Sequence, residues 1–247
     1  MQAASRLWEI DAARGIAILM MIVFHTVFDL SFFAICPVNV ASGFWRYFAY
    51  ATATLFLLIA GISLVVSHAR ASARLSGFSL AEKFILRGAG IFALGLLVTV
   101  ATWFYLHEGY VIFGILHLIG VSIILSPLFF RFGKLNVLLG LVCIPAGFLI
   151  SHVSGPAFLI PLGIMPAGFT SVDYTPLLPW FGVVLVGLGL GEFLYAGGVR
   201  QFSLKPLSDY IVTPLSFLGR HSLVLYLVHQ PVIILLLAAV TGTKYCN

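Results

Sequence analysis

Two ionisable side chains interrupt the first apolar stretch of the chain. Residues Ala12–Phe33 form a run of mostly Ile, Leu, Met, Val and Phe that also contains His25 and Asp29. Positions four apart share one face of a helix, and ionisable groups at bilayer depth usually face a polar cavity and perform a function. A carboxylate one turn away can orient an imidazole and raise its basicity. The pair therefore predicts acid–base or nucleophilic chemistry.

Two more histidines fall at similar depth in later apolar stretches. A rise of about 1.5 Å per residue places His25 roughly 3 Å and Asp29 roughly 9 Å to the outer side of the middle of their stretch. By the same rise, His117 lies about 5 Å outside the middle of its stretch, and His229 lies near the middle of the last one. If these helices are neighbours, all four residues line one cavity and are catalytic. Alternatively, His117 and His229 each satisfy a nearby backbone carbonyl.

A second polar group stands where three helices are expected to begin, on the cytoplasmic side. Basic groups around a cavity mouth suit a phosphate-rich ligand that arrives from the cytosol. The residues that we expect to bind it are Asp11, Arg14, Arg87, Arg220 and His221. Asp11 and Arg14 are also spaced to form an ion pair at a helix start, and Arg87 also fits a charge that sets topology.

The composition indicates that lipid is the solvent for most of the surface. Of the 247 residues, 61% are hydrophobic and 9% are charged, whereas a soluble domain carries about 25% charged residues. Strands of a membrane barrel would alternate in polarity, but these runs are apolar throughout. We predict an all-α, multi-pass helix bundle of the cell membrane, with residues 1–247 forming a single domain. The positive charges lie mostly in short loops, so nucleic acid is not an expected partner, and no Cys/His spacing indicates a metal.

Seven segments have the roughly 20 apolar residues that cross a bilayer. They are Ala12–Phe33, Trp45–Ser67, Gly88–Leu106, Val111–Phe130, Leu135–Val153, Leu177–Tyr195 and Leu218–Thr241. The stretch Gly155–Thr170 is apolar but is interrupted by three prolines, which favours a re-entrant or interfacial loop. Glycines within the spans fit close helix packing; they are Gly88, Gly90, Gly95, Gly182, Gly187, Gly189 and Gly191.

Basic residues gather in alternate loops. Those on the N-terminal side are Arg6, Arg14, Arg70, Arg74, Lys83, Arg87, Arg131, Lys134, Arg200 and Lys205. The opposite side has His107, Glu108 and Asp173, with Arg46 near a span end and Lys244 in the tail. Cytoplasmic loops carry the excess of Lys and Arg, so we expect a cytoplasmic N-terminus and an outer C-terminus.

Four blocks of sequence carry a resemblance to a known family. They are Arg6-Leu-Trp-Glu-Ile-Asp11-Ala-Ala-Arg14-Gly15, Leu55-Phe-Leu-Leu-Ile-Ala-Gly61-Ile-Ser63, Gly114-Ile-Leu-His117-Leu-Ile-Gly120 and Leu218-Gly219-Arg220-His221-Ser222-Leu-Val-Leu-Tyr226-Leu-Val-His229-Gln230-Pro231. Together they resemble the heparan-alpha-glucosaminide N-acetyltransferase catalytic-domain family, within the transmembrane acyltransferase superfamily. The chain looks closest to its short prokaryotic members.

The resemblance implies transfer of an acyl group, in particular acetyl, from cytosolic acyl-CoA to an acceptor on the far side of the membrane. The acceptor is expected to be a sugar or glycan amine or hydroxyl. CoA phosphates would lie near Arg14, Arg87 and Arg220. His25, oriented by Asp29, would act as general base or would itself accept the acyl group.

The lysosomal member departs from this chain in several respects. It is longer, and it has asparagine at the position of His25 and glutamine at that of His117. The reaction class therefore carries over better than the catalytic assignment.

A proton-coupled transporter or channel is the main alternative function, because buried ionisable groups also form ion paths. The sequence shows no inverted repeat and no pair of broken helices in its two halves, which such transporters often have. A structural subunit would leave His25 and Asp29 unexplained. Membrane lipids are expected partners, and a homo-oligomer is an open alternative.

Overall fold

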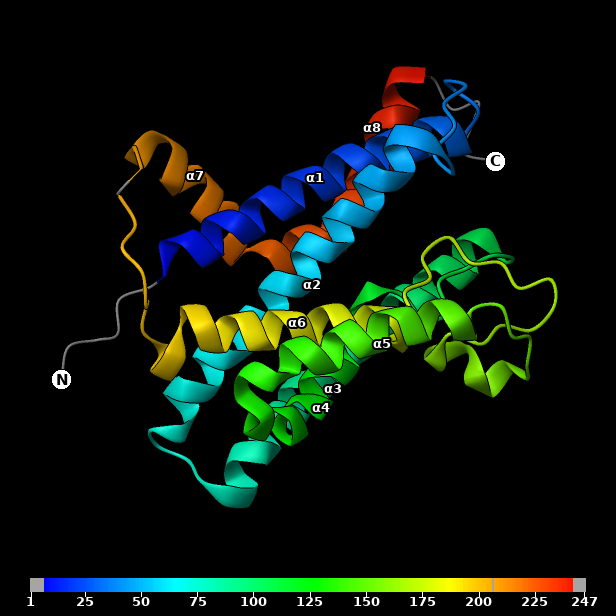
Figure 1. Cartoon of the computed structure of the whole chain (residues 1–247). Coiled ribbons are helices and arrows are strands. Elements are labelled where there is room, and N and C mark those ends of the chain that lie inside the picture. Colours follow the sequence, from blue (N-terminus) through cyan, green and yellow to red (C-terminus); the bar gives the residue numbers. More distant parts are fainter. Residues whose placement is uncertain (1–6, 206, 242–247) are drawn as a thin grey trace. The chain divides into compact units, whose positions relative to one another are not determined.

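The computed structural model describes residues 7–205 and 207–241, and they fold into helices (Figure 1). The helices are α1 (Trp8–Phe32), α2 (Gly43–Ser72), α3 (Gly77–Leu106), α4 (Ile115–Phe129), α5 (Asn136–Ile150), α6 (Leu177–Leu194), α7 (Asp209–Arg220) and α8 (Ser222–Thr241). Short 3-10 helices are η1 (Phe130–Leu135), η2 (Ala157–Leu162) and η3 (Ala196–Gly198). The described residues contain no strand, so the all-α prediction is confirmed. Arg6 and Lys244, used above for orientation, lie outside these residues.

Within the described ranges, six helical segments are long and apolar enough to cross a membrane: α1, α2, α3, Ile115–Ile150, α6 and α8. The protein is thus a multi-pass membrane protein. The expected fourth and fifth spans both overlap Ile115–Ile150, but the fourth began four residues too early and the fifth ended three residues too late. Gly133, at φ 49°, interrupts this segment between α4 and α5, which have 15 residues each and are therefore about 22 Å long. The count of seven and the orientation stay predictions.

The chain divides into two compact units. The first comprises Met1–Phe56 and Leu204–Asn247, and its described part holds α1, the beginning of α2, α7 and α8. The second comprises Leu57–Ser203 and holds the rest of α2 together with α3 to α6. The single domain over residues 1–247 stays a prediction.

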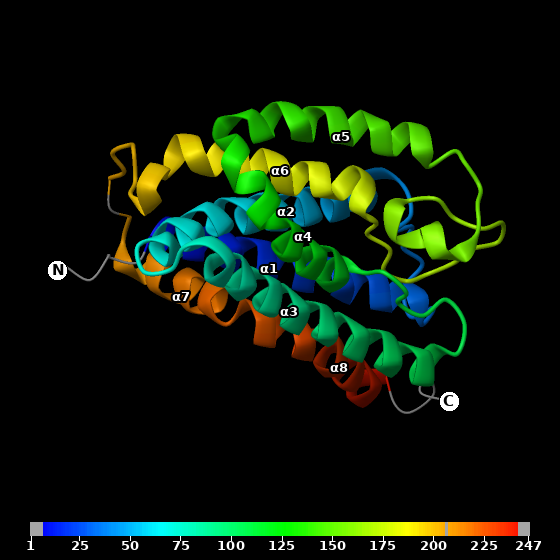
Figure 2. The same cartoon turned by 90° about the horizontal axis from the view of Figure 1, so that it is seen from below.

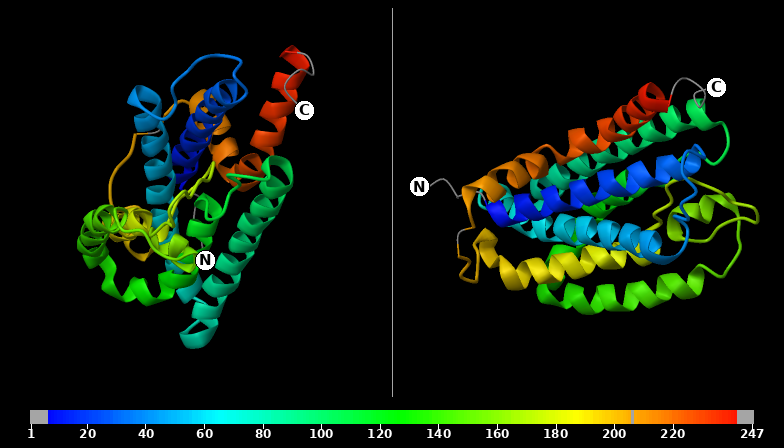
Figure 3. Two further views of the ribbon diagram at one scale, coloured as in Figure 1. Left: turned by 90° about the vertical axis from the view of Figure 1, so that its right-hand side faces the viewer. Right: turned by 90° about the horizontal axis from the view of Figure 1, so that it is seen from above.

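In the first unit, α7 and α8 follow one another along α1 in the same direction (Figure 3). Two glycines bring the backbones together. A Cβ on Gly15 would overlap the carbonyl of Leu215, and one on Gly219 would overlap the carbonyl of Asp11. Each contact therefore needs a residue without a side chain, which fixes how α7 is aligned along α1.

The last predicted span, Leu218–Thr241, began too early. α7 extends to Arg220, and α8 begins at Ser222. The break falls at His221, whose φ of −99° and ψ of 14° are not helical. Mean hydropathy does not detect such a break, nor an amphipathic helix such as α7.

The second unit is built from closely paired helices. α5 lies along α6 (Figure 2), and α3 packs on α4. A Cβ on Gly88 would press on the Gly120 carbonyl, and one on Gly182 on the Gly140 carbonyl, while Gly187 faces Leu58 of α2. The predicted role in helix packing is confirmed for these glycines but is wrong for Gly90, where nothing lies within 4 Å of a Cβ.

The segment expected to form a non-spanning loop lies between α5 and α6. Its only helix is the short η2, and it is not among the six candidate spans. The Tyr174 hydroxyl anchors it by donating to the Ile160 carbonyl at 2.7 Å, and burial raises the pKa of Tyr174 to about 12. Phe158, which is 76% exposed, gives this segment an apolar outer surface.

The glycine contact in the first unit can be tested by stability. Gly15→Ala should lower the free energy of unfolding by about 1–3 kcal/mol, because the new methyl group overlaps the α7 backbone. Gly90→Ala is the matched control, since nothing lies within 4 Å of a Cβ there; better helix propensity should leave it neutral or slightly stabilised. Thermal unfolding in detergent measures both, and equal melting temperatures would contradict the close contact.

Candidate active site

The two groups predicted to be catalytic on α1 both face α8. His25 and Asp29 are one turn apart, and Asp29 is only 2% exposed. From α8, Gln230 donates a hydrogen bond from Nε2 to Asp29 Oδ1 at 2.6 Å. The other carboxylate oxygen, Oδ2, is buried and has no hydrogen-bond partner among the described residues. Asp29 is therefore held by the last helix, and it makes no recorded hydrogen bond to His25.

His25 instead contacts a second histidine. Its ring stands edge-on to that of His229, with centroids 4.9 Å apart and planes at 70°. His229 is 9% exposed, and its Nδ1 donates to the Tyr226 carbonyl at 2.6 Å. The structure thus brings together three of the four residues predicted to be catalytic, His25, Asp29 and His229, at one contact between α1 and α8.

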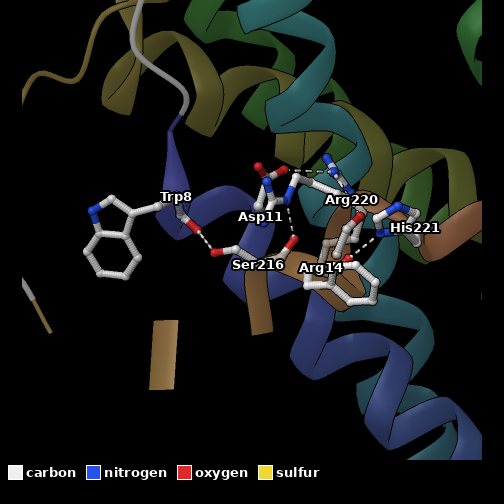
Figure 4. Close-up of polar contacts among 8 residues, drawn as sticks. Trp8, Asp11, Arg14, Ser216, Arg220 and His221 are labelled. Atoms are coloured by element: carbon white, nitrogen blue, oxygen red, sulfur yellow. Dashed lines mark hydrogen bonds and ion pairs between the residues drawn. The ribbon is translucent and has the colours of Figure 1, made fainter. Parts of the chain in front are cut away.

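A second polar cluster lies where α7 meets the beginning of α1 (Figure 4). Arg14 forms an ion pair with Asp11, with Nη1 3.3 Å from Oδ1. The same nitrogen reaches the Gly219 carbonyl at 3.5 Å. Arg14 therefore links the first turns of α1 to the residue directly before Arg220.

The end of α7 orders the other two members of this cluster. Arg220 Nε donates to the Ser216 carbonyl at 3.1 Å, and His221 Nδ1 donates to the Phe217 carbonyl at 2.8 Å. The Ser216 hydroxyl in turn donates to the Trp8 carbonyl at 3.4 Å. Four of the five residues predicted to bind a phosphate-rich ligand, Asp11, Arg14, Arg220 and His221, thus belong to one cluster (Figure 4).

The remaining predicted residues belong to the second unit. Arg87 donates from Nη1 to the Ser67 hydroxyl at 3.3 Å. His117 is 1% exposed at the start of α4. Its Nδ1 accepts from the Gly114 N–H at 3.2 Å, and its Nε2 lies 3.4 Å from Thr99 Oγ1. Because both ring nitrogens are engaged, His117 is placed to cap a helix; a cavity shared with His25 stays a prediction.

Sequence reasoning missed two polar groups that hold these elements. Gln230, the partner of Asp29, was seen only as a neighbour of His229. Asp173 accepts from the Ile115 N–H at 3.2 Å and so caps α4 from a distant loop. Neither residue carried a local signal, because each acts on a helix far away in the sequence. The described residues contain no group of three or more His, Cys, Asp or Glu arranged to hold a metal ion.

Comparison with known proteins identifies the family. The family described as heparan-alpha-glucosaminide N-acetyltransferase, catalytic, matches residues 6–231, which is nearly the whole chain. No curated protein and no solved structure matches. The match includes the α1 cluster and the α8 residues that meet it. The chain therefore belongs to the heparan-alpha-glucosaminide N-acetyltransferase catalytic-domain family of membrane acetyltransferases.

Proposed function

We propose that this protein transfers an acetyl group from cytosolic acetyl-CoA to a sugar or glycan hydroxyl or amine at the outer side of the membrane. The family match supports the reaction class. The observation that carries the proposal for this chain is the α1–α8 contact, where His25, Asp29, His229 and Gln230 gather within apolar stretches of two helices. Polar groups this deep in a span are expensive, so a purely structural role would be a costly one.

The chemistry assigned to this contact needs a neutral imidazole. One histidine of this contact, His25 or His229, acts on the acceptor as general base, or His25 briefly carries the acyl group, and both roles are open to a histidine near neutral pH. Asp29 and His229 lie at the same contact between α1 and α8. His117, in the second unit, serves α4 through its two hydrogen bonds.

The donor is assigned to the cluster at the start of α1. Guanidinium groups bind phosphate through charge-assisted hydrogen bonds. Among described contacts, Arg220 uses only Nε, on the Ser216 carbonyl, which leaves its two terminal nitrogens for a CoA phosphate. Arg14 positions this end of α7 through Gly219. Arg87 is assigned to the same ligand only by its charge and expected depth.

Helix directions support seven crossings. Trp8 contacts Ser216 and Asp29 contacts Gln230, so α1 is parallel to α7–α8. Two spans that cross in the same direction need an odd number of crossings between them. The five helices α2 to α6 satisfy this if α4 and α5 cross separately, whereas treating Ile115–Ile150 as one span gives four.

A second pair of helices gives the same parity. Gly187 faces Leu58, and Gly191 faces Val65, so α2 is parallel to α6 within the second unit. An odd number of crossings must again separate them, and α3, α4 and α5 provide it. Together with the basic loops, this supports a cytoplasmic N-terminus and an outer C-terminus.

The topology can be tested with C-terminal reporter fusions. Fusions after Gly77 and Arg200 should report the cytoplasm, and one at Asp173 should report the outer side. The fusion at Gly133, between α4 and α5, should report the cytoplasm as well. If Asp173 and Arg200 report the same side, the seven-span topology is wrong.

The catalytic group can be tested by acetyl-CoA turnover in proteoliposomes. His25→Ala should reduce acetyl transfer or CoA release by at least about 100-fold, on the scale of a lost acid–base group, while acetyl-CoA still binds. Asp29→Asn should reduce the rate by about tenfold to a thousandfold, because it removes the buried charge but keeps the shape of the side chain. His152→Ala, in the loop after α5, is the control. A fully active His25→Ala enzyme would exclude this site.

The donor cluster can be tested by binding. Arg220→Ala should weaken acetyl-CoA binding about tenfold, equivalent to about 1.4 kcal/mol, and the difference should shrink at high salt. Arg74→Ala removes the same charge from an exposed position on the predicted cytoplasmic side and should have no such effect. Acetyl-pantetheine, which lacks the nucleotide phosphates, should bind wild type and Arg220→Ala equally well. Equal loss of affinity for both ligands would mean that Arg220 does not contact phosphate.

A further inference from the structure

The hydrogen bonds of His229 determine which of its ring nitrogens is free. Nδ1 lies 2.6 Å from the Tyr226 carbonyl oxygen. A carbonyl can only accept, so Nδ1 carries the hydrogen. In a neutral imidazole the other nitrogen, Nε2, is then an unprotonated lone pair. The backbone of α8 therefore fixes His229 in the tautomer that a base acting through Nε2 requires.

That lone pair is buried and has no partner among the described residues. Leaving such an atom unpaired is unfavourable. Two more unpaired buried atoms belong to the same helix contact, Asp29 Oδ2 and Gln230 Oε1. The amide nitrogen of Gln230 donates to Asp29. The remaining Gln230 atom, the amide oxygen, can only accept. All three atoms accept, so the contact is suited to a ligand group that donates hydrogen bonds.

His25 lacks the feature that makes His229 a defined base. Within the described residues it makes ring contacts but no recorded hydrogen bond, so nothing selects one tautomer. The carboxylate expected to orient it is held by Gln230 instead. His117 differs in the opposite way, because partners occupy both of its nitrogens.

We propose that His229 is the catalytic base, and that its Nε2 receives the proton of the acceptor; this rests on the acetyltransferase function proposed above. The acceptor oxygen or nitrogen attacks the thioester carbonyl carbon and forms the new C–O or C–N bond as its proton moves to Nε2. The C–S bond breaks, and the CoA thiolate leaves with the electron pair. The proton then passes from His229 to the sulfur, which returns the imidazole to its neutral form.

The neighbours of His229 fit this assignment. The titratable groups whose rings contact it are His25 from α1 and Tyr226 from its own helix, and Asp29 contacts the next residue, Gln230. The ring of His25 lies against the base and leaves Nδ1 of His229 to the backbone. Asp29 belongs to the same contact through Gln230, the residue that follows His229.

The test compares two matched variants, His229→Asn and His25→Asn. Asparagine at 229 keeps an N–H donor for the Tyr226 carbonyl but has no basic lone pair. Its kcat should fall by about 10²–10⁴-fold, with KM for acetyl-CoA within about twofold of wild type. CoA thiol release is measured in proteoliposomes from pH 5 to 9, with glucose and glucosamine as acceptors. His229→Gln is made as well, in case the asparagine variant is unstable.

The pH profile separates the two histidines. The wild-type rate should rise with pH and level off as the base loses its proton. His229→Asn should lose this rise, whereas His25→Asn should keep it at whatever rate remains. If His229→Asn and His229→Gln keep the rise, or His25→Asn alone loses it, His229 is not the base. A wild type that releases no CoA with either acceptor would instead overturn the proposed function itself.

Discussion

The close approach of the α1 and α7 backbones is the constraint on which the rest of the first unit depends. Gly15 and Gly219 remove the side chains that would separate the two helices. Once these backbones touch, the alignment of α8 along α1 follows, since only His221 separates α7 from α8. Helix contacts of this kind replace the hydrophobic effect, which does not act between helices in lipid. The contact between His25 and His229 is therefore determined by glycines that lie more than two helical turns from either histidine.

In the first unit, buried polar groups form hydrogen bonds in two different ways. Near the start of α1, side chains satisfy backbone carbonyls, as Arg14 does with Gly219 and Arg220 with Ser216. Deeper in the contact, Asp29 depends on another side chain, Gln230. The first arrangement fixes the geometry of the cluster and uses only Nε of Arg220. The second leaves acceptors without a partner in the described part of the chain, which is the pattern expected where a ligand completes the hydrogen bonding.

The sequence predicted the class and most of the helices because apolar length is a direct consequence of bilayer thickness. It also predicted that His25, Asp29 and His229 share one layer, since depth follows from helical rise. It did not predict α7, a separate helix whose buried residues are the small Ser216 and Gly219. It assigned Asp29 to His25 by spacing, but i and i+4 residues share a face without having to bond. The Gln230 partner depends on how two distant helices align, and nothing local in the sequence encodes that alignment.

The pairing of Asp29 with Gln230 has a consequence for how the protein is made. The two residues are 201 positions apart, so α1 enters the membrane long before its partner is synthesised. At about 5–20 residues per second, the carboxylate waits on the order of 10–40 s without its amide. During that interval, water, a proton or another protein must compensate the charge. If synthesis stops before Gln230, the released chain keeps the Asp29 carboxylate without its amide partner. This buried unpaired carboxylate distinguishes an incomplete chain from a complete one.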